Sequence, residues 1–118
     1  MSLEQTIADF FVYFNSRDLE KLGGLLKPEA RFSFPKTQPL LGIERILKFL
    51  RILFRQYPEL VFTTHRTIVQ ENWAAVHWTN QGKNRRGEPY ENEGVTLLEF
   101  EDGQITFISD FFKDTGKF

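Results

Sequence analysis

The chain has 118 residues, a length that fits one domain, 1–118, and its 15 Lys and Arg side chains nearly balance its 16 Asp and Glu side chains. Because no field of one sign results, nucleic acid and an anionic membrane are not expected as partners. The chain has no Cys and only two His residues, so a metal site is not expected, and no cofactor is implied.

The first segment is predicted to be a helix and not a targeting sequence. Ser2 can cap a helix in which the apolar residues of 3–14 recur at helical spacing, and no basic region precedes an apolar run. No window approaches the roughly 20 apolar residues of a membrane span, so we expect a soluble, cytoplasmic protein. Asp18 is then expected to cap a shorter helix that ends before Pro28.

The remaining elements predict an α+β domain. A short strand is expected at 30–34, and a third helix is expected to begin near Gly42 and to end at Tyr57. From Leu60 onward the apolar period changes to two, which predicts strands joined by hairpins at 60–69, 73–81, 90–101 and 104–112. This order predicts a cone-shaped barrel, with three N-terminal helices packed on a curved, mostly antiparallel sheet. Its open end is expected to form a ligand pocket of about 300 to 1,000 Å³.

Asp110 is the most informative single residue. It is a lone carboxylate within the otherwise apolar segment 104–112, which follows an Asp102–Gly103 turn. Burial in an apolar wall disfavours the charged carboxylate and raises its pKa, which is one way to obtain a proton-transfer group that works near neutral pH. The alternative is an Asp at a frayed or edge position of the last strand.

Hairpin counting adds three polar candidates. A tight turn at 71–72 pairs Arg66 with His77 and places Thr79 on the same face, and the same count across Asp102–Gly103 pairs Val95 with Asp110. In a shared pocket, His77 could exchange a proton with Asp110, and Arg66 could hold a ligand carboxylate or enolate. The alternatives are a hydrogen-bonded sheet histidine and a solvated arginine on the outer face.

Aromatic residues are abundant, with 13 Phe among 18 aromatic side chains. Such side chains supply apolar area both to cores and to ligand sites. Five of them could form an apolar ligand wall, although core packing is the alternative for each. These are Phe10, Phe14, Phe34, Phe54 and Phe112.

Three segments, Phe14–Leu22, Pro39–Ile46 and Phe100–Phe112, occur in an order that resembles the nuclear-transport-factor-like superfamily. Within it, the chain is most similar to the SnoaL-like polyketide cyclases and the ketosteroid isomerase-like proteins. The resemblance implies the cone-shaped fold and places Asp110 and His77 toward the cavity. SnoaL-like cyclases carry an acid/base Asp on the last strand, where Asp110 stands.

The resemblance implies a cofactor-independent cyclase- or isomerase-type enzyme in which Asp110 moves a proton on an apolar carbonyl substrate. The alternative is a non-catalytic small-molecule-binding or dimeric accessory domain of the same fold. We also expect a homodimer through the outer face of the sheet, because both alternating faces of the last two strands are apolar. For that interface the alternation groups four residues on one face, namely Leu98, Phe100, Phe107 and Phe111.

Overall fold

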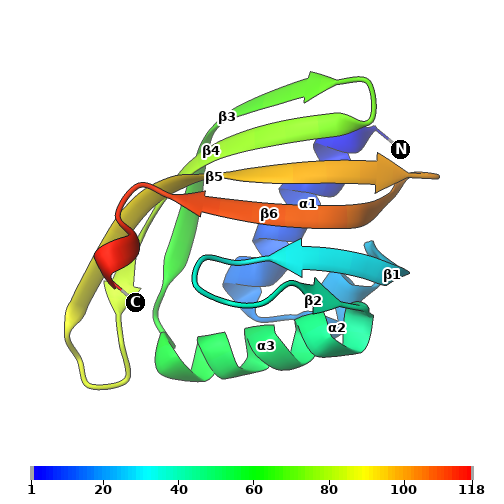
Figure 1. The fold of residues 1–118 in the computed structure, drawn as a ribbon. Helices are drawn as coiled ribbons and strands as arrows, with labels where there is room; N and C mark the ends of the chain where they lie inside the picture. Colours follow the sequence, from blue (N-terminus) through cyan, green and yellow to red (C-terminus); the bar gives the residue numbers. More distant parts are fainter. Residues whose placement is uncertain (1, 118) are drawn as a thin grey trace.

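The computed structural model describes residues 2–117. Three helices, α1 (Leu3–Ser16), α2 (Leu19–Gly23) and α3 (Ile43–Gln56), accompany one sheet (Figure 1). The strands are β1 (Leu26–Ser33), β2 (Leu40–Leu41), β3 (Val61–Gln70), β4 (Trp73–Lys83), β5 (Pro89–Glu101) and β6 (Gln104–Phe112). A short 3-10 helix, η1 (Thr115–Lys117), ends the described chain.

The helices begin where the sequence predicts. The backbone N–H of Gln5 donates to Ser2 Oγ at 3.1 Å, and that of Lys21 donates to Asp18 Oδ1 at 3.1 Å. Each cap satisfies an amide that has no partner within its helix. Helix α3 follows Gly42, whose φ of +94° is one that side-chain-bearing residues rarely adopt. All three predicted helix starts are therefore confirmed.

The sheet has the strand order β2-β1-β6-β5-β4-β3, and β1 and β6 form the parallel pair. The predicted α+β class and the mostly antiparallel sheet are confirmed. The sheet is curved, but its edge strands β2 and β3 do not pair with each other. It therefore does not close into the expected barrel. In Figure 1, α1 crosses one face of the sheet, and α3 runs beside β1 and β2.

The inner face of the sheet forms the core with the helices. Alternate residues of β4 and β5 are buried, as expected for strands with one face on a core. Across these strands Trp78 pairs with Gly94, and Gly94 pairs with Phe112 of β6. The indole of Trp78 is fully buried and packs 4.7 Å from the ring of Phe62 on β3.

Side chains at the end of α1 fasten this helix to β3 and α3. Asn15 acts like a strand partner: Nδ2 donates to the carbonyl of Phe62, and Oδ1 accepts from its N–H, both at 2.9 Å. Arg17 donates from Nη2 to the carbonyl of Tyr57 at 2.9 Å, and its guanidinium lies 5.0 Å from the ring centroid of Phe54. These contacts fix the helix ends that surround one end of the cone.

Two details differ from the expected elements. Strand β1 begins at Leu26, four residues earlier than expected, and contains Pro28 at an irregularity in the β1–β6 register. Proline lacks an N–H donor, and such an irregularity is where a strand tolerates it. The two-residue strand β2 was not expected.

Within residues 2–117, none of the helices has both the length and the hydrophobicity that a membrane crossing requires.

Candidate functional site

A small cavity lies inside the cone, between the inner face of the sheet and the ends of α1 and α3. Its volume is about 20 Å³, which is room for about one water molecule. The prediction of a ligand-sized pocket inside the cone is therefore wrong. Aromatic rings pack edge-to-face across the space instead. Phe14 lies 5.0 Å from Phe62, and Phe34 lies 5.2 Å from Phe112.

Asp110 lines this cavity and ends a chain of hydrogen bonds. Thr96 Oγ1 lies 2.7 Å from Asp110 Oδ1, and Trp78 Nε1 lies 2.8 Å from Thr96 Oγ1. An indole N–H can only donate, so it uses the hydroxyl oxygen as acceptor and leaves the hydroxyl proton for the carboxyl group. Asp110 Oδ1 is therefore occupied, whereas Oδ2 makes no hydrogen bond to the described residues.

The environment of Asp110 raises its pKa to about 7. Desolvation is the main cause, because a charged carboxylate loses hydration in this surrounding, and the hydrogen bond from Thr96 opposes the shift. Asp110 keeps an intermediate exposed fraction, yet the protein atoms around its carboxyl group make desolvation the larger effect. The expected rise of this pKa is confirmed.

The register of β5 and β6 explains why Asp110 faces inward. Asp110 pairs with Thr96 and not, as the count from the turn predicts, with Val95. The register shifts near Phe100, where Thr106 is the extra residue of β6. Because side chains alternate between faces, a slip of one residue moves every later side chain to the other face.

His77 and Asp110 lie on opposite faces of the sheet, so their expected contact is wrong. His77 pairs with Arg66, as predicted, and with Val95, whose face is the outer one. The Nε2 N–H of His77 donates to Glu93 Oε2 at 2.6 Å, and this bond is the largest cause of the lowered pKa of Glu93. His77 is thus a hydrogen-bonded sheet histidine, the alternative that the sequence left open.

Arg66 and Thr79 also belong to the outer face. Arg66 is exposed beside His77, which is the solvated position considered as its alternative. Thr79 Oγ1 lies 2.7 Å from His65 Nε2. Neither side chain lines the Asp110 cavity, because Thr79 alternates along β4 with the inward-facing Trp78 and Asn80, and Arg66 pairs with the outward-facing His77.

The five candidate aromatic residues divide into two groups. Phe14, Phe34 and Phe112 line the cavity with Asp110. Phe10 and Phe54 are not among its lining residues; the ring of Phe10 packs 5.2 Å from that of Phe11, and that of Phe54 packs 4.9 Å from that of Phe14. These two residues fill the core, as their alternative role proposed.

The sequence reasoning missed several residues of the site. Thr96 and Trp78 orient Asp110, and Asn80, Tyr57 and Tyr90 line the cavity. Alternation within 74–80 and 92–100 contains the needed signal, because it separates an inward set from an outward set. The signal could be used only once the register was known.

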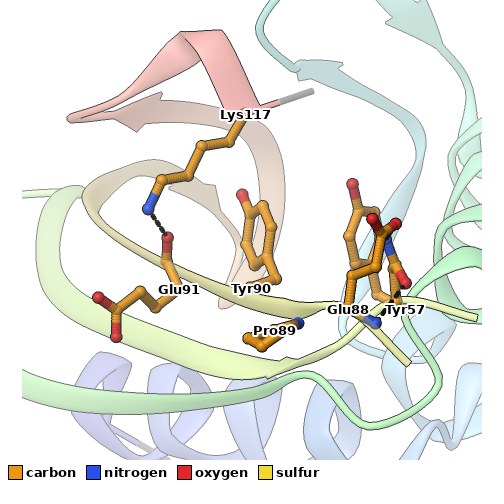
Figure 2. Close-up of a pocket in the computed structure, with 7 residues that line it drawn as sticks. Tyr57, Glu88, Pro89, Tyr90, Glu91 and Lys117 are labelled. Carbon is orange, nitrogen blue, oxygen red and sulfur yellow. Dashed lines mark hydrogen bonds between the residues drawn. The ribbon is translucent and has the colours of Figure 1, made fainter. Parts of the chain in front are cut away.

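A larger hollow lies outside the cone, near the end of α3 and the β4–β5 hairpin. Its volume is about 600 Å³, and Figure 2 shows Tyr57, Tyr90 and Lys117 among its lining residues. The rings of Tyr57 and Tyr90 lie 5.0 Å apart, and both residues also line the inner cavity. Burial raises the pKa of Tyr90. The two rings therefore form a common wall between the hollow and the cavity.

Helices that cover one face of a curved, mostly antiparallel sheet match the NTF2-like cone fold. Residues 7–108 match the sequence profile of the SnoaL-like domain, and the chain belongs to this family. The resemblance to the SnoaL-like family that the sequence indicated is thereby confirmed. No curated protein sequence matches the chain.

Solved structures confirm the fold. An NTF2-like protein of unknown function from Burkholderia pseudomallei is 22% identical with a TM-score of 0.91, covering 99% of this chain and 95% of its own. TerC, crystallised with polyporic acid, is 21% identical with a TM-score of 0.88, covering 97% and 92%. IdmH from Streptomyces antibioticus, a candidate polyketide cyclase, is 21% identical with a TM-score of 0.85, covering 96% and 93%.

Proposed function

We propose that the chain is a cofactor-independent enzyme of the SnoaL-like type, in which Asp110 moves a proton on an apolar, ring-containing carbonyl substrate. The observation that carries this proposal is the carboxyl group of Asp110, with a pKa of about 7, in a cavity lined by aromatic rings. A general acid or base is most efficient when its pKa lies near the working pH. The aromatic lining suits the flat faces of a ring system.

Structural relatives support the same class of ligand. TerC was crystallised with polyporic acid, and IdmH is a candidate polyketide cyclase.

The two oxygens of Asp110 have different roles in the proposed reaction. Oδ1 stays bound to the hydroxyl of Thr96, while Oδ2 takes a proton from the carbon beside the substrate carbonyl. The electron pair of the broken C–H bond moves toward the carbonyl oxygen and gives an enolate. Return of the proton from Oδ2 to a conjugated carbon isomerises the substrate and restores the carboxylate, whereas return to the same carbon restores both the substrate and the carboxylate and allows only hydrogen exchange at that carbon.

Access to the cavity requires movement of aromatic side chains, because the space holds about one water molecule. Tyr57 and Tyr90 separate it from the outer hollow, so outward rotation of one ring would join the two spaces. Rotation of a partly exposed side chain is fast compared with a typical turnover.

Solvent deuterium exchange into 1-tetralone, followed by proton NMR at the carbon beside its carbonyl, tests the proposal. This ketone places an exchangeable C–H bond on an apolar two-ring frame. We expect Asp110→Asn to lower the protein-dependent exchange rate by about 10²- to 10⁴-fold, because the variant keeps the shape but cannot accept the proton. Asp9→Asn on α1 is the matched control and should exchange at the wild-type rate. Equal rates in the wild type and Asp110→Asn would contradict the proposal.

The alternative is a non-catalytic small-molecule-binding or accessory domain, and the small cavity volume favours it. In that case 1-tetralone would bind without protein-dependent exchange, and Asp110→Asn would change neither the binding nor the exchange rate. The same measurements therefore separate the two functions.

We also propose that the protein acts as a homodimer through the outer face of its sheet. Large apolar side chains on this face are exposed, with Phe111 at 57%, Ile68 at 59% and Trp73 at 37%. A two-fold interface would allow this patch to cover itself.

A further inference from the structure

Asn80 is buried without a hydrogen-bond partner. Its exposed fraction is 3%, and neither Oδ1 nor Nδ2 forms a hydrogen bond with any described residue. Among residues 2–117, these are the only two buried side-chain polar atoms without a partner. An unpaired buried polar group destabilises the folded state, so a native protein that keeps one usually has a reason for it.

The neighbouring strand shows that this fold can satisfy a buried asparagine. Asn92 pairs directly with Asn80 across β4 and β5 and is 8% exposed. Its Nδ2 donates to the carbonyl of Asp114 at 2.9 Å, and its Oδ1 accepts from the N–H of Asp114 at 3.2 Å. Asn80 has no such arrangement and instead lines the cavity that also contains Asp110.

Asn80 and Asp110 both line this cavity, but their positions on the sheet are well separated. They share the inner face, with β5 between their strands and the Trp78–Gly94 pair between their rows. Along the strands they are four residues apart, or about 13 Å, and across the sheet they are two strand spacings apart, or about 10 Å. Curvature brings the side chains closer together, but one ligand atom cannot contact both.

We propose that Asn80 is a second polar anchor of the site, and that it binds a hydroxyl group at the end of the substrate away from the carbonyl on which Asp110 acts. This inference rests on the proposed function of Asp110. A carboxamide offers both a donor and an acceptor, and a hydroxyl group can use both at once. The substrate class is therefore an elongated, ring-containing hydroxyketone, whose apolar middle lies among the aromatic rings of the cavity.

Two probes that differ by one hydroxyl group test the proposal. These are 1-tetralone and 6-hydroxy-1-tetralone, in which ketone and hydroxyl lie at opposite ends of the same frame. Isothermal titration calorimetry should give a dissociation constant on the order of tenfold lower for the hydroxylated probe. Asn80→Leu should reduce this preference to about one, and Asn80→Ala provides the same comparison if the leucine variant does not fold. Gln81→Leu, on the outer face of the same strand, should keep the preference.

A second readout separates a ligand-binding role from a structural one. Because Asn80→Leu removes two unpaired polar atoms, we expect it to raise the melting temperature of the free protein, by about 4 °C or more. A residue whose polar atoms served folding alone would lower the melting temperature when replaced. Higher stability combined with weaker hydroxyl binding is the expected signature.

The outcomes distinguish this inference from the proposed function. Equal affinity for the two probes, or a preference that survives in both Asn80 variants, would overturn the role of Asn80 and leave Asp110 untouched; a single water bound to the carboxamide would give this result. A hydroxyl preference that is retained in Asp110→Asn, together with no protein-dependent exchange in the wild type, would support Asn80 and contradict proton transfer. Absence of binding by either probe at millimolar concentration would count against both.

Discussion

At the scale of single residues, Asp110 couples protonation to folding. Its pKa in the folded protein is about 7, compared with an ordinary value of 3.8. Between these values the folded state binds more protons than the unfolded state, so stability falls as the pH rises. The contribution is fully present below about pH 4 and is lost as the pH passes through about 7. The full shift corresponds to about 4 kcal/mol as an upper limit.

Asp110→Asn should remove this dependence. Denaturant unfolding at pH 5 and at pH 8 gives the free energy of unfolding of both proteins. Between these pH values, we expect the wild type to lose about 2 to 3 kcal/mol relative to Asp110→Asn, because only the wild type must ionise a desolvated carboxyl group. Asp9→Asn should follow the wild-type profile. Parallel profiles for the wild type and Asp110→Asn would show that the carboxyl group is not desolvated in solution.

The sequence predicted part of the chemistry of this site. A carboxylate inside an apolar strand was enough to identify Asp110, and its place in the cavity and the direction of its pKa shift are confirmed. Its hydrogen-bond partner was not predictable in the same way. The contact with Thr96 depends on the register: the sequence count paired Asp110 with Val95, and the family resemblance placed Asp110 in one cavity with His77.

At the scale of elements, two extra residues in the strands shift the register, and one of them, Thr106, accounts for the error at Asp110. Counting from the Asp102–Gly103 turn gives the correct pair Phe100 and Ile105, and then fails beyond Thr106. In β3 the count is correct for Arg66 and His77 and fails beyond His65. A β-bulge has no strong local signature in the sequence, whereas turns and caps do.

Close packing at Gly94 gives an element-scale prediction. A Cβ atom at this position would lie 2.3 Å from the carbonyl oxygen of Phe111 and 2.7 Å from the ring of Trp78. Gly94→Ala should therefore push β5 and β6 apart, displace the indole that donates to Thr96, and lower the free energy of unfolding by about 1 to 3 kcal/mol. Denaturant unfolding measures the loss, and the fluorescence of Trp78 should change with it.

Gly24→Ala is the matched control, because Gly24 has helical backbone angles and an added Cβ would come no closer than 3.3 Å to its neighbours. It should be neutral or slightly stabilising, by up to about 1 kcal/mol. If both alanine variants had the same stability as the wild type, the indole would not be held against β5 as described.

At the scale of the whole molecule, the order of elements was enough to predict the fold, but not the volume inside it. Periodicity and caps identified three helices and the long hairpins, because each depends on residues close together in the chain. The cavity volume depends on how rings from α1, from the segment that follows β1, and from β3 and β6 pack together, which no local pattern specifies. The sequence thus predicted a ligand-sized pocket where the rings leave room for about one water molecule.

The register shift at Thr106 also changes which residues can form the predicted dimer interface. Leu98 and Phe100, assigned to the interface from alternation, are 0% and 2% exposed and lie in the core. Phe107 does face outward, where the guanidinium of Arg31 lies 5.1 Å from its ring centroid. With Phe111 and Trp73, it gives the outer face an apolar patch of different composition from the one predicted.

Light scattering on wild-type protein at micromolar concentration should give twice the chain mass of 13.9 kDa. Phe111→Glu should give the mass of one chain, because it places a carboxylate within the patch, and a two-fold interface places that change on both sides. Val12→Glu is the control: Val12 is 59% exposed on α1, on the other side of the sheet, so this variant should stay dimeric. A wild-type mass of one chain, or a dimer that survives Phe111→Glu, would mean that the outer face does not pair with itself.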